Sequence, residues 1–397
     1  MADLAPPRVP DAEWTRRPAL ARLVGALGEG NVRWVGGAVR DTLLGQDVHD
    51  IDAATPLEPV EVIDRLEAAG IRTIPTGIDH GTVTAILDGG NVEITTLRHD
   101  VSTDGRRATV AFASDWKDDA ARRDFTINAL YAHPSTREVF DYFGGVADLE
   151  AKRVRFIGDA RQRIREDYLR ILRYFRFQAR FGSALDAEAE EACAELAESL
   201  KGLSRERVGW ELQNLLALPD PGPTVARMRE LGVLQVVLPE AGKQEVDKLS
   251  RLVAVENAAG VRPHAMRRLA ALLPAVPPVA EGVAARLRLS KNQRARLTCT
   301  AARDTRDGDS PRALAYAVGV DCAIDRLLLE GQDIDALKRW EPPVLPVKGG
   351  EIVARGVRAG PEVARILRAV ERRWVDEGFP DRERVAAILE DELARRG

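Results

Sequence analysis

The sequence predicts an α+β protein in which a small mixed sheet with helices comes first and an all-helical part follows. Up to about residue 150, short runs rich in Val, Ile and Thr alternate with helical stretches. Beyond that residue the β-like runs disappear and apolar residues recur with helical spacing. Because a single hydrophobic core rarely serves a chain of 397 residues, we expect two or more domains.

The predicted elements of the N-terminal part are short. A strand at 32–35 leads through two glycines into a helix at 38–44, and a longer helix is predicted at 59–69. Further strands are predicted at 81–87, 91–97 and 138–142.

Helical periodicity and its interruptions organise the remainder. Turns rich in Gly, Pro or Ser separate the predicted helices, and Pro-rich stretches at 274–278 and 341–346 mark later boundaries. The first four of these helices are predicted at 163–181, 186–200, 204–218 and 223–234. On the third of them, Arg207 and Glu211 at i and i+4 are expected to form an ion pair.

The composition of the chain indicates which partners it can bind and in which cellular compartment it is expected. The chain carries 58 Lys and Arg against 62 Asp and Glu, a net charge of -4, so RNA contacts must come from local arginine patches. Cys193, Cys299 and Cys322 have neither metal nor disulfide spacing, which is typical of a reducing compartment. The sequence contains no secretory signal and no bilayer-spanning window, so we expect a soluble, cytoplasmic protein.

Two adjacent glycines predict a phosphate-binding turn. Gly36 and Gly37 allow the backbone to approach a ligand closely, and the helix that starts there favours anions at its N-terminus. Arg40, one turn into that helix, is a candidate partner for triphosphate oxygens.

Asp50 and Asp52 are the candidate metal ligands. On a strand, residues at i and i+2 point to the same face, which is what two divalent cations need in order to share ligands. Glu93, in the predicted strand 91–97, is a candidate third carboxylate. The alternative is that the aspartates are turn or capping acids and that Glu93 is a solvent-facing strand residue.

A polar cluster precedes an apolar run at 122–130. Arg123 and its neighbour Arg122 are candidate phosphate contacts, while Asp124 and Asn128 have the donors and acceptors to bind ribose hydroxyls. Asp124 as a simple helix cap is the alternative.

The helix predicted at 163–181 carries a charged stripe. Arg163, Glu166 or Asp167, Arg170 and Arg173 follow one another at spacings of three or four, so they form one polar stripe among Tyr, Leu, Ile and Phe. The alternative is a solvated face with internal ion pairs.

A base-reading function for this stripe would select particular nucleotides. A carboxylate only accepts and a guanidinium only donates, which matches the Watson–Crick edges of cytosine and adenine and opposes those of uracil and guanine. The protein would then act as its own template.

In order along the chain, these motifs resemble those of the bacterial class II tRNA nucleotidyltransferase and poly(A) polymerase family, most closely its CCA-adding enzymes. They are Gly-Gly-x-Val-Arg-Asp, Asp-x-Asp, Arg-Arg-Asp-Phe-Thr-x-Asn-Ala, Asp-Tyr-Phe-Gly-Gly at 141–145 and Glu-Asp-x-x-Arg-x-x-Arg at 166–173, within about residues 31–210. The resemblance implies a polymerase-beta-like nucleotidyltransferase head (1–150), then an all-helical neck (151–215), body (216–330) and tail (331–397).

Carried over by position, the resemblance assigns roles to the candidate residues. Asp50 and Asp52 would bind two Mg²⁺ ions, with Glu93 as helper. Residues 141–145 match the family's hinge between head and neck. The nucleotide would be contacted by Gly37, Arg40 and Arg123, and its base selected by Asp167, Arg170 and Arg173. The residues themselves add Asp124, Asn128 and Arg176 as further candidates for nucleotide binding.

The implied activity is addition of CMP, CMP and AMP to the tRNA 3′ end from CTP and ATP, without a nucleic-acid template and with release of pyrophosphate. Expected partners are the tRNA acceptor arm and nucleoside triphosphates, with no membrane or protein partner. The alternatives are a poly(A) polymerase or a specialised CC-adding or A-adding enzyme. A catalytically inactive tRNA-binding protein is disfavoured because Asp50 and Asp52 are both present.

The polar segment 98–107 is predicted as a mobile loop that shifts the base-selecting helix between C and A addition. On this hypothesis, deletion of residues 100–107 leaves CC addition near normal and strongly reduces the terminal A.

Overall fold

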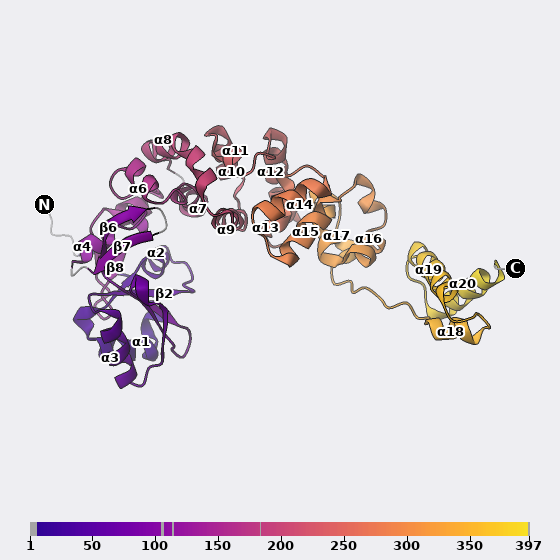
Figure 1. Ribbon diagram of the computed structural model, residues 1–397, viewed down its shortest axis with the longest axis horizontal. Helices are drawn as coiled ribbons and strands as arrows, with labels where there is room; N and C mark the ends of the chain where they lie inside the picture. The colour runs from indigo at the N-terminus through magenta and orange to yellow at the C-terminus, as the bar shows by residue number, and fades with distance from the viewer. Residues whose placement is uncertain (1–5, 105–106, 113–114, 183, 396–397) are drawn as a thin grey trace. The chain divides into compact units, whose positions relative to one another are not determined.

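The computed structural model describes residues 6–104, 107–112, 115–182 and 184–395 (Figure 1). The chain divides into two compact units, Met1–Pro239 and Glu240–Gly397. Among the described residues, all strands lie in the first unit, and the second unit is helical. The predicted α+β class is therefore confirmed. No helix within those ranges is long and apolar enough to cross a membrane.

The strands are short, as predicted. They are β1 (Arg33–Val35), β2 (Ile51–Thr55), β3 (Thr73–Gly77), β4 (Thr82–Ala85), β5 (Val92–Thr96), β6 (Arg98–Asp104), β7 (Arg107–Phe112), β8 (Leu130–Ala132) and β9 (Val139–Asp141).

Helices of the first unit are α1 (Pro18–Leu27), α2 (Gly37–Leu43), α3 (Pro59–Ala68), α4 (Trp116–Ala121), α5 (Gly145–Glu150), α6 (Ala160–Glu166), α7 (Arg170–Phe181), α8 (Ala187–Glu195), α9 (Arg205–Leu216), α10 (Gly222–Glu230) and α11 (Val233–Val237). Those of the second unit are α12 (Lys243–Ala259), α13 (Ala265–Ala271), α14 (Pro277–Arg286), α15 (Lys291–Ala301), α16 (Pro311–Val318), α17 (Val320–Leu329), α18 (Gly349–Ala354), α19 (Pro361–Asp376) and α20 (Arg382–Ala394).

A seven-stranded mixed sheet forms the centre of the N-terminal part, in the order β3-β4-β5-β2-β1-β8-β9. Only the β2–β5 pair is parallel, and the other described pairs are antiparallel. Its register places Asp52 of β2 opposite Val35 of β1 on one side and opposite Glu93 of β5 on the other. Val35, Leu97 and Tyr131 are buried in one apolar cluster together with Ile157, which follows the sheet in the sequence.

Residues 98–104 form a strand, not the predicted loop. β6 pairs with β7 in a separate antiparallel sheet, from Arg98 opposite Phe112 to Asp104 opposite Arg107. The β-branched residues of this segment and its Asp-Gly dipeptide at 104–105 are a hairpin signal that outweighs its polarity. Residues 105–106 lie outside the described part of the chain.

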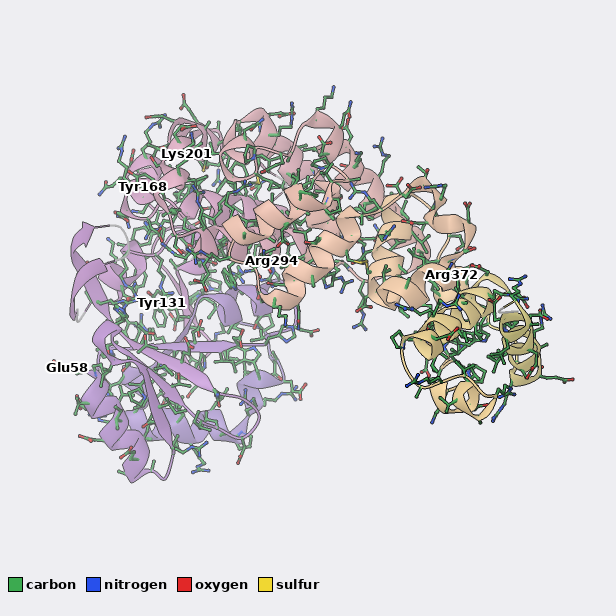
Figure 2. The ribbon with its side chains drawn as sticks, turned by 45° about the vertical axis from the view of Figure 1, so that its right-hand side comes forward. Glu58, Tyr131, Tyr168, Lys201, Arg294 and Arg372 are labelled. Atoms are coloured by element: carbon green, nitrogen blue, oxygen red, sulfur yellow. A yellow bond between two sulfur atoms is a disulfide. The ribbon has the colours of Figure 1, made fainter. Side chains whose placement is uncertain are left out.

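The single helix predicted at 163–181 is two helices. α6 ends at Glu166 and α7 begins at Arg170, and Asp167 between them has extended backbone angles of φ −155° and ψ 105°. The Asp167 carboxylate accepts a hydrogen bond from the Leu169 N–H at 3.1 Å, a local bond that competes with helix continuation. Tyr168, labelled in Figure 2, marks this junction.

The expectation that no two cysteines pair is wrong. Cys299 of α15 and Cys322 of α17 form a disulfide, with their Cα atoms 6.3 Å apart. Their separation of 23 residues in sequence carries no pairing signal, because the intervening chain folds back and brings the two helices into contact. Cys193 is free and buried.

The second unit contains a buried charged cluster. Glu256 accepts hydrogen bonds from Arg267 (2.6 Å) and Arg268 (2.8 Å), and Asp325 accepts from Arg267 (3.0 Å) and from Arg296 (2.6 Å). These bonds join α12, α13, α15 and α17. They also supply the paired, hydrogen-bonded partners without which a buried charge would be strongly unfavourable.

The run at 141–145 forms a tight junction after the last strand. The Asp141 carboxylate accepts hydrogen bonds from the backbone N–H groups of Gly145 and Val146, both at 2.9 Å, at the start of α5. A Cβ atom on Gly145 would lie 2.3 Å from the Thr126 carbonyl oxygen. Glycine is required here because the two backbone segments are in direct contact.

Replacing Gly145 by Ala should therefore destabilise the first unit by about 1–3 kcal/mol or more, because the added methyl group must displace backbone atoms. Urea unfolding measures the effect. Gly25→Ala in α1 is the matched control, since a Cβ atom on Gly25 would meet nothing within 4 Å, and there the change should be neutral or stabilising. Equal stabilities for the two variants would contradict the close backbone contact.

Candidate functional site

The first unit contains a cavity of about 1070 Å³ lined by residues far apart in the sequence. Its walls come from the turn before α2, the start of β2, the segment after α4, the α6–α7 junction and α9. Every predicted site residue except Glu93 lines it, namely Gly37, Arg40, Asp50, Asp52, Arg123, Asp124, Asn128, Asp167, Arg170, Arg173 and Arg176. The fold thus gathers the separate motifs at one place.

The glycine turn is formed as predicted. Gly36 has φ 68°, a conformation that favours glycine, and α2 starts directly after it. No described side chain caps α2, so the first N–H groups of the helix remain available at the cavity wall.

Arg40 is buried within the wall and holds other residues. Its guanidinium donates to the carboxylate of Asp41 (2.8 Å) and to the amide oxygen of Asn128 (2.5 Å), and it lies over the ring of Phe181. Burial lowers its pKa, although Asp41 opposes this shift. A direct contact of Arg40 with phosphate stays a prediction, and the observed contacts give it a positioning role as well.

Three carboxylates lie on or beside the central strands β2 and β5, and two of them, Asp50 and Asp52, line the cavity. Asp50 precedes β2, Asp52 lies in β2, and Glu93 is its neighbour on β5. Burial, together with the negative charges of Glu93 and Asp50, raises the pKa of Asp52 to about 6, while Arg123 opposes the shift. The crowding of negative charge disfavours ionised Asp52 unless a cation is present.

This donor set matches what Mg²⁺ prefers. In the described residues, no group of three or more His, Cys, Asp or Glu side chains is arranged so that it could hold a metal ion by itself. Mg²⁺ usually binds through one or two carboxylates together with water and substrate phosphates, so Asp50 and Asp52 at an open cavity fit this ion.

The two arginines at 122–123 are fixed by an acid that sequence reasoning missed. Buried Asp119 accepts hydrogen bonds from Arg122 (2.8 Å), Arg123 (3.2 Å) and the hydroxyl of Tyr131 (2.6 Å), which is labelled in Figure 2. Burial alone would raise the pKa of Asp119, but the Arg123 and Arg122 charges hold it below its usual range. Its position three and four residues before the arginines was the available signal.

Asp124 is fully engaged by the chain. One carboxylate oxygen accepts from the Phe125 N–H (2.9 Å) and the Asn128 amide (3.0 Å), and the other accepts two bonds from Arg173 (2.8 and 2.5 Å). Burial opposes ionisation, but Arg173 and Asn128 prevail and lower the pKa of Asp124 to about 2. Asp124 therefore joins the segment after α4 to α7, and ribose contact by Asp124 stays a prediction.

The shifted pKa of Asp124 predicts a pH-dependent stability. Because the folded-state pKa is lowered, the stabilisation is complete above the ordinary value of 3.8 and is lost as the pH falls toward 2. Asp124→Asn should cost roughly 2 kcal/mol at pH 7, and the difference from wild type should shrink below about pH 4. Urea unfolding between pH 3 and pH 7 tests this. The exposed α4 residue Asp118, changed to Asn, is the control, and a pH-independent difference for Asp124→Asn would contradict the assignment.

Asp167 and Arg170 both line the cavity but have different partners. Asp167 accepts from Arg207 of α9 at 2.6 Å. Arg170 donates to Glu166 (2.5 Å) and to the carbonyls of Arg163 (2.8 Å) and Arg122 (3.3 Å). A guanidinium has five N–H groups, so Arg170 still has donors for a ligand. The predicted stripe is split by the junction, and base selection by this pair stays a prediction.

Helix α9 contributes residues that the sequence interpretation did not place here. Glu211, 1% exposed, accepts from Arg176 at 2.7 Å and lies 3.7 Å from Arg173. The expected Arg207–Glu211 pair is wrong, because Arg207 instead binds Asp167. Trp210 and Arg180 also line the cavity.

Comparisons with known proteins show which family the chain resembles. Residues 32–155 match the family model of the poly A polymerase head domain, and residues 183–244 match the probable RNA and SrmB-binding site of polymerase A. The chain is 37% identical to the mitochondrial CCA tRNA nucleotidyltransferase 1 of Mus musculus, with 88% of this chain and 83% of that protein covered. It is 44% identical to a CCA-adding enzyme of Streptococcus pyogenes over 47% of this chain and 46% of that one.

A solved structure shares the architecture. The Bacillus stearothermophilus CCA-adding enzyme in complex with CTP matches with a TM-score of 0.75 and 26% identity, over 96% of this chain and 98% of that one. The resemblance seen in the motifs is thereby confirmed over most of the chain. The chain belongs to the family of CCA-adding tRNA nucleotidyltransferases and poly(A) polymerases.

Proposed function

We propose that the protein is a template-independent RNA nucleotidyltransferase that adds CMP, CMP and AMP to the 3′ end of tRNA from CTP and ATP. The observation that carries the proposal is the single cavity that joins the Gly36 turn, the Asp50 and Asp52 carboxylates and Asp167. The names of the relatives and the CTP complex of the Bacillus enzyme support it.

In the proposed reaction, the terminal 3′-hydroxyl oxygen of the RNA attacks the α-phosphorus of the nucleotide. The new phosphodiester P–O bond forms as the bond to the β-phosphate oxygen breaks, pyrophosphate leaves, and the hydroxyl proton passes to water or a carboxylate. Two Mg²⁺ ions held by Asp50 and Asp52, with Glu93 beside them, would lower the pKa of the hydroxyl and neutralise charge on the phosphates.

The chain's own groups would orient the triphosphate. The free N–H groups at the start of α2 face the cavity, and Arg123 lines the same wall in a fixed position beside Tyr131 (3.1 Å). These donors suit phosphate oxygens. Arg40 and Asn128 would hold the turn in place from behind.

Base selection is assigned to the α6–α7 junction. The Asp167 carboxylate would accept a hydrogen bond from the exocyclic amine of cytosine or adenine. An unused N–H of Arg170 would donate a hydrogen bond to the adjacent ring nitrogen. Arg173 and Arg176, bound to Asp124 and Glu211, would keep α7 in register with the head.

The proposed division of labour follows the expected domains. Residues 1–150 would catalyse, 151–215 would select the base, and 216–330 and 331–397 would bind tRNA. A cytoplasmic location stays a prediction, since matched relatives include mitochondrial proteins.

The test is a set of extension reactions with purified protein, Mg²⁺, and tRNAs ending at the discriminator base, at C and at CC, with each nucleoside triphosphate in turn. We expect C, C and A to be added in that order, and no product with UTP or GTP. The family model named for poly A polymerase favours a second candidate, which would instead extend RNA with a run of A. Products that stop at CC, or addition of A alone, would assign a specialised enzyme.

A further inference from the structure

Trp210 is an exposed aromatic residue in a cavity that is lined mostly by charged side chains. It lies on α9 and is 56% exposed, whereas Trp14, Trp34 and Trp374 are buried. The apolar residues that bury α9 against its neighbours lie on another face of the helix, namely Val208, Leu212, Leu215 and Leu216. The Trp210 indole therefore does not stabilise the core.

Within the part of the chain that the structure describes, no other aromatic ring and no guanidinium is in ring contact with Trp210. An exposed indole offers a large, flat and rigid apolar face that a binding partner can cover. Arginines such as Arg207 and Arg176 line the same cavity and would attract a phosphate backbone. A flat ring beside cationic groups is the arrangement on which single-stranded nucleic acids stack their bases.

Exposure distinguishes the outer from the inner part of the cavity. Side chains that would hold the incoming base are largely covered, at 26% exposed for Asp167 and 14% for Arg170. Trp210 is far more exposed and lies one helical turn beyond Arg207, the residue that contacts Asp167. The RNA end has to enter from solvent, so the exposed ring is accessible to it, whereas the side chains proposed to hold the incoming base are largely covered.

The chemistry of stacking also favours the RNA over the incoming nucleotide. In the proposed reaction the terminal base of the acceptor changes at each step, from the discriminator base to C and then to the second C. Stacking accepts any base, because every base has a π-face, whereas hydrogen bonds to an edge would reject some of them. The incoming base must be discriminated, and polar groups such as Asp167 serve that purpose.

We propose that the Trp210 indole stacks on the 3′-terminal base of the RNA acceptor and so positions its 3′-hydroxyl for attack. This inference rests on the proposed function, because it assigns a place to the RNA substrate of that site. Trp210 would be a positioning residue for the acceptor, with no part in nucleotide choice.

The kinetic test compares Trp210→Ala, Trp210→Phe and Trp210→Leu during C addition to tRNA. Loss of stacking should lower kcat/KM for tRNA about tenfold or more in the Ala and Leu variants and leave the KM for CTP near the wild-type value. Phe should restore most of the activity, because it retains an aromatic face. Leu185→Ala is the matched control, since Leu185 is 55% exposed in the same unit and outside the cavity lining.

A second arm replaces the terminal nucleotide of the tRNA by an abasic one that retains its 3′-hydroxyl. The wild type should lose about as much kcat/KM on this substrate as Trp210→Ala loses on normal tRNA, and the variant should lose little more. Additive losses, or a rise in the KM for CTP with that for tRNA unchanged, would overturn the proposal.

Fluorescence separates this inference from the proposed activity. Normal tRNA should quench indole emission more in the wild type than in Trp210→Phe, and the abasic tRNA should remove that difference. If the wild type extends no tRNA, the proposed function fails, and the quenching still decides whether Trp210 stacks on a terminal base. Equal quenching in both proteins would refute stacking.

Discussion

Changing Asp50 or Asp52 to Ala is expected to reduce nucleotide incorporation by roughly 10³-fold or more in Mg²⁺, because several kcal/mol of transition-state stabilisation would be lost. Asp50 is exposed and Asp52 only partly covered, so neither supports the core. Single-turnover extension of tRNA with CTP measures the loss. Binding of tRNA, followed by gel shift, should remain near wild type.

Stability provides an independent check on this assignment. The raised pKa of Asp52, about 6, means that its ionised form is unfavourable in the folded protein at neutral pH. Asp52→Ala should therefore leave the thermal midpoint unchanged or raise it, the usual relation between activity and stability at a functional site. A variant that lost activity because it unfolds would instead show a lowered thermal midpoint.

Asp47→Ala is the matched control, since Asp47 is an exposed acid of the same loop and is absent from the cavity lining. It should retain turnover. Glu93→Gln should show a smaller loss than the aspartate variants, because Glu93 lies beside Asp52 but not in the cavity lining. Near wild-type turnover by Asp50→Ala or Asp52→Ala in Mg²⁺ would contradict the metal assignment.

Local sequence signals were sufficient for the first part of the site. The turn at Gly36, the helix after it and the strand of Asp52 are encoded within a few residues and form as predicted, whereas Asp50, which was expected on the same strand, lies one residue before it. The run of β-branched residues around Glu93 likewise predicted a strand, which the structure contains as β5. The backbone conformation at such places depends on the residues themselves, so short-range rules suffice.

Partners across the fold could not be predicted. Arg207 was expected to pair with Glu211 at i+4, yet its guanidinium reaches Asp167, 40 residues earlier. Glu211 instead accepts a hydrogen bond from Arg176 of α7. Helical spacing shows which residues share a face, but it does not show which other helix packs against that face.

The split of the helix at 163–181 illustrates a second limit. Periodicity favoured one continuous helix, and the chain contains no Gly or Pro at the break. The extended Asp167 is stabilised by its bond to Leu169 N–H and by Arg207, and the second of these is a tertiary contact. A residue that departs from local preference at a cavity wall is where a function is expected.

Asp167→Ala is expected to reduce the preference for CTP and ATP over UTP and GTP by roughly 10²-fold, because a partly buried acceptor no longer opposes the carbonyl of the wrong base. Asp167 and Arg170 both line the cavity, and of these two only Asp167 carries a negative charge that would repel a base carbonyl. The measurement is the ratio of kcat/KM values for the four nucleotides on one tRNA.

Asp167→Asn separates charge from structure. Its amide oxygen can still accept the hydrogen bond from Leu169 N–H, so the α6–α7 junction should persist, while its NH₂ group can donate to the carbonyl of uracil or guanine. The Asn variant should therefore fold as the wild type does and admit UTP and GTP. In both variants Arg207 loses its ionic partner, so Arg207→Ala controls for that contact. If both Asp167 variants lost activity equally with all four nucleotides, Asp167 would support the junction and would not read the base.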